Sequence, residues 1–338
     1  MEIRFFDKTL AFLGISDGAV KVTAEEKALG TGVFTAVIPL GDAAGSFAAV
    51  GGHIITDNGT AYTIERVIRD ETCRTLTLYA VEIMEVLRRS VISTPKKFTG
   101  SPGEIIAGIV SKYSVSPVSV VHSGTGAATV WCASLGLLYD ELKDISEAFS
   151  LTYRMTIENG ALVLTVNGVN DRTSEVVLSD EFGTADIIAE KKDISNYANV
   201  AVIFGESTAQ SAPLIEPFSI TVADCGFTDG IDDTEYGTRS IAVYKNTSKL
   251  VYIYETASGF EAISKRELLV RLGKTALATH RPVIKYSAVF TETTPHIDIG
   301  DRVTVRSDRF GAYRAATVIS LRYAFDGKST VRTAVLRV

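Results

Sequence analysis

Apolar and polar positions alternate over much of the first hundred residues, as they do in β-strands. The run FTAVIPL at 34–40 is rich in β-forming residues, and Leu76 and Leu78 share one face of CRTLTLYAV while threonines occupy the other. Two β-branched, apolar runs flank Asn58 and Gly59, the dipeptide most typical of a tight hairpin turn. The first part of the chain is therefore predicted to form a β-sheet.

A helical periodicity replaces this alternation further along. A short helical pattern covers 81–90. Ser101, Pro102 and Glu104 then form a capping box with proline at the first helical position, and apolar residues keep one face of the segment that follows. LYDELKDISEAF at 138–149 repeats the pattern, with acidic residues opposite the apolar ones. Two helices are therefore predicted after residue 100.

The later part of the chain is again mostly β in its pattern. An Asn-Gly turn at 159–160 predicts a hairpin that completes a small α+β unit, and an Asp-Gly turn at 326–327 predicts the last hairpin. Segments 211–220 and 226–240 are typical of loops, the second with a solvated acidic cluster. One long helix is predicted at 260–280. Strands and helices do not alternate regularly, so a doubly wound parallel sheet is disfavoured.

Composition is that of an ordinary globular protein with a length sufficient for about two or three domains. Net charge is −6 and the signs are interspersed, so no basic stripe suggests binding to a nucleic-acid backbone. Cys73, Cys132 and Cys225 are odd in number and far apart, which disfavours a disulfide framework or a zinc knuckle and predicts small buried apolar residues. No signal peptide and no transmembrane stretch is evident, so folding in the cytoplasm is expected.

Four carboxylates crowd into GVNDRTSEVVLSDEFG, residues 168–183: Asp171, Glu175, Asp180 and Glu181. Paired carboxylates can hydrolyse glycosides when they face each other across a cleft at a defined gap. The surrounding residues have the composition of turns and caps, which favours a strand between two turns. We therefore expect these acids to serve as turn-formers and surface charges.

Two other patterns are weak signals, one of a metal site and one of a phosphate-binding loop. His296, Asp298 and Asp301 lie close in sequence, but a metal site needs three or four converging ligands, and a core face before a Gly-Asp turn explains them as well. The Gly-Lys-Thr at 273–275 lacks the earlier glycine of a phosphate loop, since residue 268 is leucine, and it lies within a helical pattern. Trp131, the one tryptophan, is expected in a core and not on a sugar-binding platform.

Several stretches together resemble the tail-hub, or baseplate-hub, proteins of siphophages and prophages, which are related to the central hub of contractile-tailed phages. These stretches are the segment from GGHIITDNGT to LRRSVI, the helix SPGEIIAGIV, the segment from ELKDISEAF to SDEFG, DISNYANVAVIFGE, and IDIGDRVTVRSDRFG. Their order along the chain carries the resemblance. The matching positions are Leu87, Arg89, Val91, Ile92, Gly168, Asp171, Arg172, Thr173, Ser179, Phe182, Asn199 and Gly205.

The resemblance implies an α+β, mostly β protein with two tube-like β-barrel domains and an inserted small α+β domain. The expected division is 1–97 for the first tube-like domain, 98–182 for the insertion and 183–338 for the second, which holds the helix near 260–280. The implied assembly is a homotrimeric ring below the tail tube, through which tape-measure protein and DNA pass. The implied location is the virion tail, after assembly in the host cytoplasm.

The implied partners are a second and third copy of the chain, the distal tail or tube and tape-measure proteins, and fibre or spike proteins. Sequence-specific nucleic-acid binding and a membrane segment are not expected. No catalytic, cofactor-binding or metal-binding residue is assigned. Because the sequence ends at Val338, right after its last hairpin, the C-terminal peptidase or fibre-like domain of many relatives is not expected. Two alternatives stay open: a cell-wall hydrolase using Asp180 and Glu181, or a sugar-binding module using Trp131.

Overall fold

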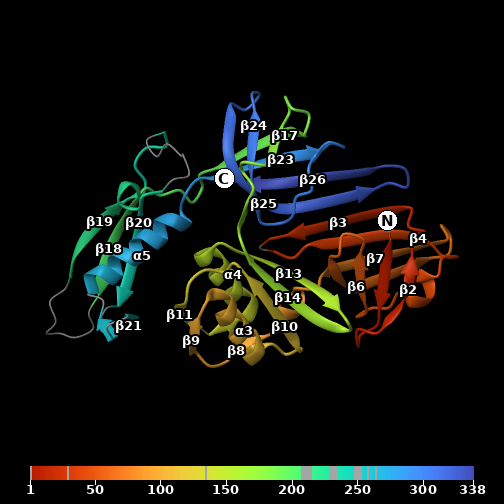
Figure 1. Cartoon of the computed structure of the whole chain (residues 1–338), viewed down its shortest axis with the longest axis horizontal. Coiled ribbons are helices and arrows are strands. Elements are labelled where there is room, and N and C mark those ends of the chain that lie inside the picture. The colour runs from red at the N-terminus through yellow and green to blue at the C-terminus, as the bar shows by residue number, and fades with distance from the viewer. Residues whose placement is uncertain are drawn as a thin grey trace. The chain divides into compact units, whose positions relative to one another are not determined.

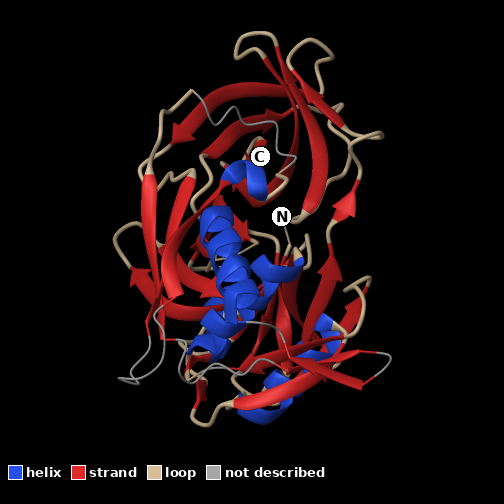
Figure 2. Ribbon diagram, turned by 90° about the vertical axis from the view of Figure 1, so that its left-hand side faces the viewer, coloured by secondary structure: helices blue, strands red, loops and turns tan. Residues whose placement is uncertain are grey.

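The computed structural model describes residues 2–28, 30–133, 135–206, 215–227, 235–246, 253–256, 259–262 and 265–338. Two compact units divide the chain, and each is considered by itself (Figure 1). The first comprises residues 1–190 and 286–337, and the second comprises 191–285 with Val338. Strands dominate and helices are few, as the sequence pattern predicts (Figure 2).

A single 14-stranded sheet forms the framework of the first unit. Its main path runs in the order β17, β23, β26, β25, β3, β4, β7, β6, β5, β1 and β2, while β15, β16 and β24 lie off this path. The strands are β1 (Ile3–Phe6), β2 (Phe12–Ser16), β3 (Lys21–Lys27), β4 (Val33–Pro39), β5 (His53–Thr56), β6 (Ala61–Asp70), β7 (Thr75–Glu82), β15 (Asn170–Asp171), β16 (Val177–Ser179), β17 (Ala185–Asp193), β23 (Val283–Phe290), β24 (Asp301–Ser307), β25 (Ala312–Phe325) and β26 (Thr330–Arg337).

Strands from the two ends of the chain meet in this sheet. β25 pairs antiparallel with β3, from Ser320 opposite Lys27 to Phe325 opposite Val22. β24 pairs with β25 on one side and, in parallel, with β15 and β16 on the other. The path is open, and the described strands close into no barrel, so the barrel geometry expected for the two β parts is absent within one chain.

The three predicted hairpins are present. β25 and β26 flank the Asp-Gly turn, in which Gly327 has a φ of +89°, a conformation that glycine adopts without steric cost. At Asn159 and Gly160 both φ angles are positive, as a two-residue turn of the I′ type requires. The turn at Asn58 is longer than a two-residue turn, because Ile55 still pairs with Ala61 and four residues remain between β5 and β6.

The segment between β7 and β15 forms the α+β insertion. Its helices are α2 (Glu85–Arg88), α3 (Pro102–Tyr113) and α4 (Leu138–Phe149), and α1 (Ala44–Phe47) precedes them in the sheet region. The predicted capping box is present at α3, where Ser101 and Glu104 bond to each other's backbone N–H groups. The strands are β8 (Val91–Ile92), β9 (Lys96–Gly100), β10 (Val118–Ser123), β11 (Thr129–Ala133), β12 (Gly136–Leu137), β13 (Leu151–Glu158) and β14 (Ala161–Gly168).

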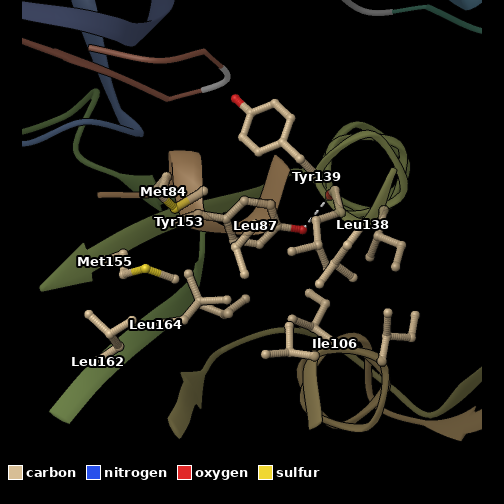
Figure 3. Close-up of a cluster of buried hydrophobic side chains, with 14 of the residues drawn as sticks. Met84, Leu87, Ile106, Leu138, Tyr139, Tyr153, Met155, Leu162 and Leu164 are labelled. Carbon is tan, nitrogen blue, oxygen red and sulfur yellow. Dashed lines mark hydrogen bonds between the residues drawn. The ribbon is translucent and has the colours of Figure 1, made fainter. Parts of the chain in front are cut away.

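One hydrophobic core fills this insertion and reaches into the segment before it. Met84 and Leu87 pack with side chains of α3, α4, β13 and β14 (Figure 3). Tyr153 lies in the same core and donates a hydrogen bond of 2.7 Å to the carbonyl of Leu142. A separate core lies under β1, β3 to β7 and α1, with Tyr323 and Phe325 of β25 packed against it. The insertion is therefore anchored to the chain segment that ends the N-terminal sheet.

The second unit is a small sheet with a helix. β18 (Val200–Glu206) lies between β19 (Ile215–Thr221), which is antiparallel to it, and β20 (Ser240–Asn246), which is parallel. A short helix, η1 (Val222–Asp224), follows β19, and β21 (Ile253–Thr256) pairs with β22 (Gly259–Ala262). α5 (Lys265–Thr279) packs on the sheet through residues such as Leu269 and Leu277.

Three local predictions are corrected by these elements. The pattern at 81–90 is a strand end followed by one helical turn, because β7 extends to Glu82. The helix predicted at 260–280 begins at Lys265, since 259–262 pairs with β21 as a strand. Part of the loop predicted at 211–220 is β19. Most of the acidic cluster predicted at 226–240 lies outside the described residues.

Candidate functional site

The acidic stretch 168–183 lies along β24. Asn170 and Asp171 pair with Asp301 and Arg302, and β16 continues the parallel pairing further along the same strand. The stretch is thus a turn, a short strand and a turn that add an edge to the C-terminal part of the sheet. This is the arrangement that its turn-forming composition predicts.

The first two carboxylates serve local bonds. Asp171 accepts hydrogen bonds from the backbone N–H of Thr173 at 3.1 Å and from its hydroxyl at 2.7 Å. The Thr173 bonds hold the pKa of the exposed Asp171 carboxyl below its ordinary value. Glu175 lies 3.5 Å from the guanidinium of Arg172. The Oδ1 atom of Asp171 accepts both of these bonds, so this oxygen fixes the turn.

Asp180 and Glu181 both bond to β24 and its neighbours. Asp180 accepts a hydrogen bond of 2.7 Å from the hydroxyl of Ser307 and another from the backbone N–H of Ile187. Glu181 pairs with Arg306 at 2.7 Å. A hydrogen bond shared with Asp308 raises the pKa of Glu181, because a shared proton favours the neutral form. The two carboxylates therefore fasten the second turn of the stretch to β24.

Asp301 is the centre of a network that ties the same stretch to the turn before β24. Its carboxylate accepts from Arg172 at 3.0 Å, from the side-chain amide of Asn170 at 3.0 Å and from the backbone N–H of Asp298 at 3.1 Å. Arg172 also donates to the carbonyl of His296 at 2.7 Å. The three hydrogen bonds that the Asp301 carboxylate accepts all come from groups within the protein, which suits a structural role.

The candidate metal ligands do not converge. The ring of His296 lies 3.2 Å from the carboxylate of Asp298, and both side chains are exposed to solvent, whereas Asp301 is buried against Arg172. No group of three or more His, Cys, Asp or Glu residues able to hold a metal ion occurs among the described residues. Ile297 is fully buried, in line with the core-face interpretation of this segment.

The Gly-Lys-Thr tripeptide lies inside α5, where Gly273 is a packing residue. A Cβ atom at this position would lie 2.4 Å from Ile203 and 2.8 Å from Ile220. Glycine therefore lets the helix approach β18 and β19 closely, a role that has nothing to do with phosphate. A phosphate loop would require the tripeptide to open a helix after a strand.

The predictions for Trp131 and for the three cysteines have different outcomes. Trp131 packs edge-on against Phe149 with ring centroids 5.8 Å apart, and its indole N–H donates to Glu141 at 2.5 Å. The ring is half-buried and packs against the outside of the core, whereas the sequence predicted it inside a core. The prediction for the cysteines is wrong at two positions, since Cys73 and Cys132 are exposed. Cys73 occupies the turn after β6, and Cys132 lies on a strand of a two-stranded pair.

Two buried carboxylates escaped the sequence analysis. Glu26 on β3 and Glu82 on β7 are 7% and 4% exposed. Glu82 accepts a hydrogen bond of 2.9 Å from the backbone N–H of Gly32. Burial, reinforced by the charge of Glu26, raises the pKa of Glu82 to about 7, and burial also raises the pKa of Glu26. Alternation along β3 and β7 placed both residues on a buried face, but only the pairing through β4 brings the two strands into one sheet.

The turn between β5 and β6 lies between this buried pair and the insertion. Asn58 and Thr60 donate side-chain hydrogen bonds to one oxygen of Glu26. The carbonyl groups of Asn58 and Gly59 accept from Arg154 and, at 3.3 Å, from Thr156 of β13. The turn therefore connects the sheet with the insertion.

A cavity of about 980 Å³ lies in the same unit. Its walls come from residues 8–10, from β5 and β6, from the α2 region and from 116–117 and 160–162 of the insertion. His53 lines it, bonded through Nδ1 to the Thr63 hydroxyl at 3.1 Å, and burial lowers the pKa of this histidine. Lys8, Glu65 and Arg89 bring charges to the wall, and all three are exposed. Neither Glu26 nor Glu82 lines this cavity.

Comparison with known families decides the affiliation. A model of the Siphovirus ReqiPepy6 Gp37-like protein family matches residues 2–335. The chain belongs to this family. No curated protein matches the sequence.

Solved structures similar to this family member include prophage tail proteins. The 43 kDa tail protein of prophage MuSo2 from Shewanella oneidensis is 14% identical with a TM-score of 0.62, over 99% of this chain and 98% of that one. The tail protein from Neisseria meningitidis MC58 is 13% identical with a TM-score of 0.64, over 99% and 96%. Prophage tail protein gp18 from Listeria monocytogenes EGD-e is 10% identical with a TM-score of 0.62, over 100% and 94%.

At such identities the likeness concerns the fold, and it extends over nearly the whole of both chains. The resemblance expected from the order of the sequence motifs is thereby confirmed for a siphovirus family with a phage tail protein fold. In the described residues, no helix has both the length and the apolar character needed to cross a membrane.

Proposed function

We propose that this protein is a structural component of a siphophage or prophage tail, a baseplate hub that works through shape and self-association. The observation that carries the proposal is the match of the entire fold, end to end, to prophage tail proteins. The family match over 2–335 adds independent support. The finer proposal is a homotrimeric ring below the tail tube, through which tape-measure protein and DNA pass.

The two ends of the large sheet support self-association. β2 ends the strand order on one side and β17 on the other, so each leaves one edge without a partner among the described strands. β2 exposes Phe12, Leu13 and Ile15, and β17 exposes Ile188. An exposed apolar edge strand is a ready template for pairing with another chain. Edge-to-edge pairing of β2 in one copy with β17 in the next would be heterologous, and three such contacts could close a ring.

Charge is distributed in a way that favours such a head-to-tail contact. Residues 301–338 carry eight basic and three acidic side chains, while residues 1–90 carry nine basic and twelve acidic ones. In a head-to-tail ring, the C-terminal strands of one copy approach the N-terminal strands of the next. Opposite net charges on these two parts steer the encounter and disfavour head-to-head pairing.

Within this proposal the chain divides as the family resemblance implies, with tube-like parts at 1–97 and 183–338 and an insertion at 98–182. In the ring, the two sheet-forming parts of each copy would supply successive segments of a tube wall. Tail tube, tape-measure, and fibre or spike proteins are the proposed partners, and the virion tail is the proposed location after assembly in the host cytoplasm. A non-enzymatic role is supported by the engagement of Asp171, Asp180 and Asp301 in internal bonds.

The mass of the assembled particle tests the ring. We expect light scattering after size exclusion to give three times the chain mass, and electron micrographs to show a ring with a central hole. Leu13→Lys should shift the population to monomer, because it places a charge on the β2 edge. Ile68→Lys is the matched control, since Ile68 is exposed on β6, in the interior of the strand order. A monomer at high concentration that is also missing from purified tail particles would reject the proposal.

Activity assays test the non-enzymatic part. We expect no clearing in peptidoglycan zymography and no binding on a glycan array. Clearing that Asp180→Asn abolishes would show a hydrolase, and glycan binding that Trp131→Ala abolishes would show a receptor module.

A further inference from the structure

The buried pair Glu26 and Glu82 is an unusual element for the interior of a sheet. Buried carboxylates are ordinarily paired with a cation, because burial of an unpaired charge is costly. Here both acids are buried, and the negative charge of Glu26 disfavours ionisation of Glu82. Both are buried, and neither lines the cavity described above, which disfavours a catalytic role.

Hydrogen-bond donors surround both carboxylates. Backbone N–H groups of Gly32 and Lys27 donate to Glu82, and side chains of Asn58 and Thr60 donate to Glu26. Such donors favour the ionised form, whereas the burial penalty opposes it and is the larger effect at both sites. Because its pKa is raised to about 7, the Glu82 carboxyl exchanges its proton near neutral pH.

The charged and titratable groups around the pair come from every neighbouring element. Arg154 of β13 is a cation that favours the ionised form of both acids, and Asp298, in the turn before β24, opposes ionisation of Glu26. Tyr62 of β6 and Tyr323 of β25 stay neutral, since burial next to Glu26 raises the pKa of each phenol. On β3 itself, the ammonium of Lys27 is paired with Glu25 at 3.0 Å. Tyr139 of α4 also lies within the electrostatic reach of Glu82, and its neighbour is Arg88.

The pair is mechanically connected to the insertion. Glu26 holds the inner side of the β5–β6 turn through Asn58 and Thr60, while Arg154 and Thr156 hold the turn's carbonyl groups from the other side. A movement that lifts this turn from Glu26 breaks both sets of bonds or drags β13 with it. It also breaks the bonds that cover the Glu26 carboxylate, whose charge acts on Glu82.

We propose that Glu26 and Glu82 form a proton-operated latch, which fastens the insertion to the sheet through the turn 57–60 while the pair holds a proton and loosens when the pair is fully ionised.

The linkage between proton binding and opening determines how pH changes the opening equilibrium. The closed state raises the proton affinity of the pair, because burial outweighs Arg154 and the local donors. Hydrated carboxylates in an opened state return towards their ordinary affinity, so opening releases protons. Opening is therefore favoured as pH rises from about 4.5 to about 7, the interval over which Glu82 is protonated when closed and ionised when open. Each proton released changes the opening equilibrium by up to about tenfold per pH unit.

Hydrogen–deuterium exchange across this interval tests the latch in the full chain. After correction for the intrinsic effect of pH, we expect the protection of peptides covering 54–63 and 151–158 to fall by about tenfold or more between pH 5 and pH 8. Glu82→Gln should remove most of that slope, because the amide cannot lose a proton. Glu158→Gln is the matched control: this exposed residue of β13 should leave the slope of the wild type unchanged.

Each outcome decides the proposal. A fall of exchange protection with rising pH that is confined to these two regions and lost in Glu82→Gln supports the latch. A flat profile in the wild type overturns it, as does an equal slope in Glu82→Gln. If Glu82→Gln does not fold, Glu82→Met, which also cannot lose a proton, takes its place with the same two outcomes. The experiment needs no assembled ring, so its result is independent of the proposed hub function.

Discussion

The substitution Glu82→Gln should change the pH dependence of stability in a calculable way. Burial, and the charge of Glu26, raise the pKa of Glu82 from 4.5 to about 7. A shift of one unit corresponds to about 1.4 kcal/mol, so the ionised, folded protein carries a penalty of about 3 kcal/mol from this one group. Between pH 4.5 and 7 the folded state binds more protons than the unfolded state. Stability of the wild type therefore falls as pH rises through this interval and then levels off.

The variant lacks this titration. Its amide oxygen can still accept the hydrogen bond from Gly32, so we expect near-equal stability of variant and wild type at pH 5. At pH 8 the variant should be more stable by about 3 kcal/mol, since the wild type must bury a charge that the variant does not have. Glu26 contributes a change of the same sign in both proteins.

Urea unfolding at pH 5, 6, 7 and 8 measures the effect. The fluorescence of Trp131, the single tryptophan, reports on the unit that contains Glu82. Glu158→Gln serves as the control, because an exposed carboxylate on β13 should leave the profile unchanged. A difference between Glu82→Gln and the wild type that stays constant from pH 5 to pH 8 would refute the reasoning.

Three further changes probe the interpretation of individual residues. Gly273→Val should destabilise the second unit by about 1–3 kcal/mol, because the new side chain collides with Ile203, while Lys274→Ala should have little effect; circular dichroism during thermal unfolding measures both. Ser101→Ala removes the capping box of α3 and should cost about 1 kcal/mol in urea unfolding, with Ser101→Asp close to the wild type. Asp180→Ala should cost about 2 kcal/mol in the same measurement, since it leaves two donors without their charged acceptor.

Local signals in the sequence predicted local structure well. The capping box at Ser101 starts α3, and the Asn-Gly and Asp-Gly pairs at 159–160 and 326–327 form hairpins, because short-range backbone geometry decides these features. Where pairing with another segment determines the secondary structure, the local sequence pattern predicts the wrong element. Residues 259–262 have a helical pattern, yet they pair with β21. The same holds for β19, which is a strand because β18 lies beside it.

The candidate site residues were likewise predictable where local sequence determines their role and not where strand pairing does. The residues of 168–183 could be assigned to turns from composition, since Asp171 bonds within its own turn. Glu26 and Glu82 could not be found from the sequence, because they are 56 positions apart and their shared burial depends on the pairing of β3, β4 and β7. An isolated glutamate in an alternating strand pattern is indistinguishable from a solvated one until the neighbouring strands are known.

The pairing of β25 with β3 explains why the chain suits a scaffold. This single contact joins strands that lie almost 300 residues apart, so the two ends of the chain form one continuous sheet around the insertion. A continuous sheet transmits load along its hydrogen bonds, and its main path ends at β2 and β17, each with one edge unpaired among the described strands. An enzyme of this size would be expected to keep its reactive carboxylates at a cavity, where substrate and water can reach them. Here Glu26 and Glu82 do not line the cavity, and Glu26 instead holds the turn that joins the sheet to the insertion, in line with the proposed structural role.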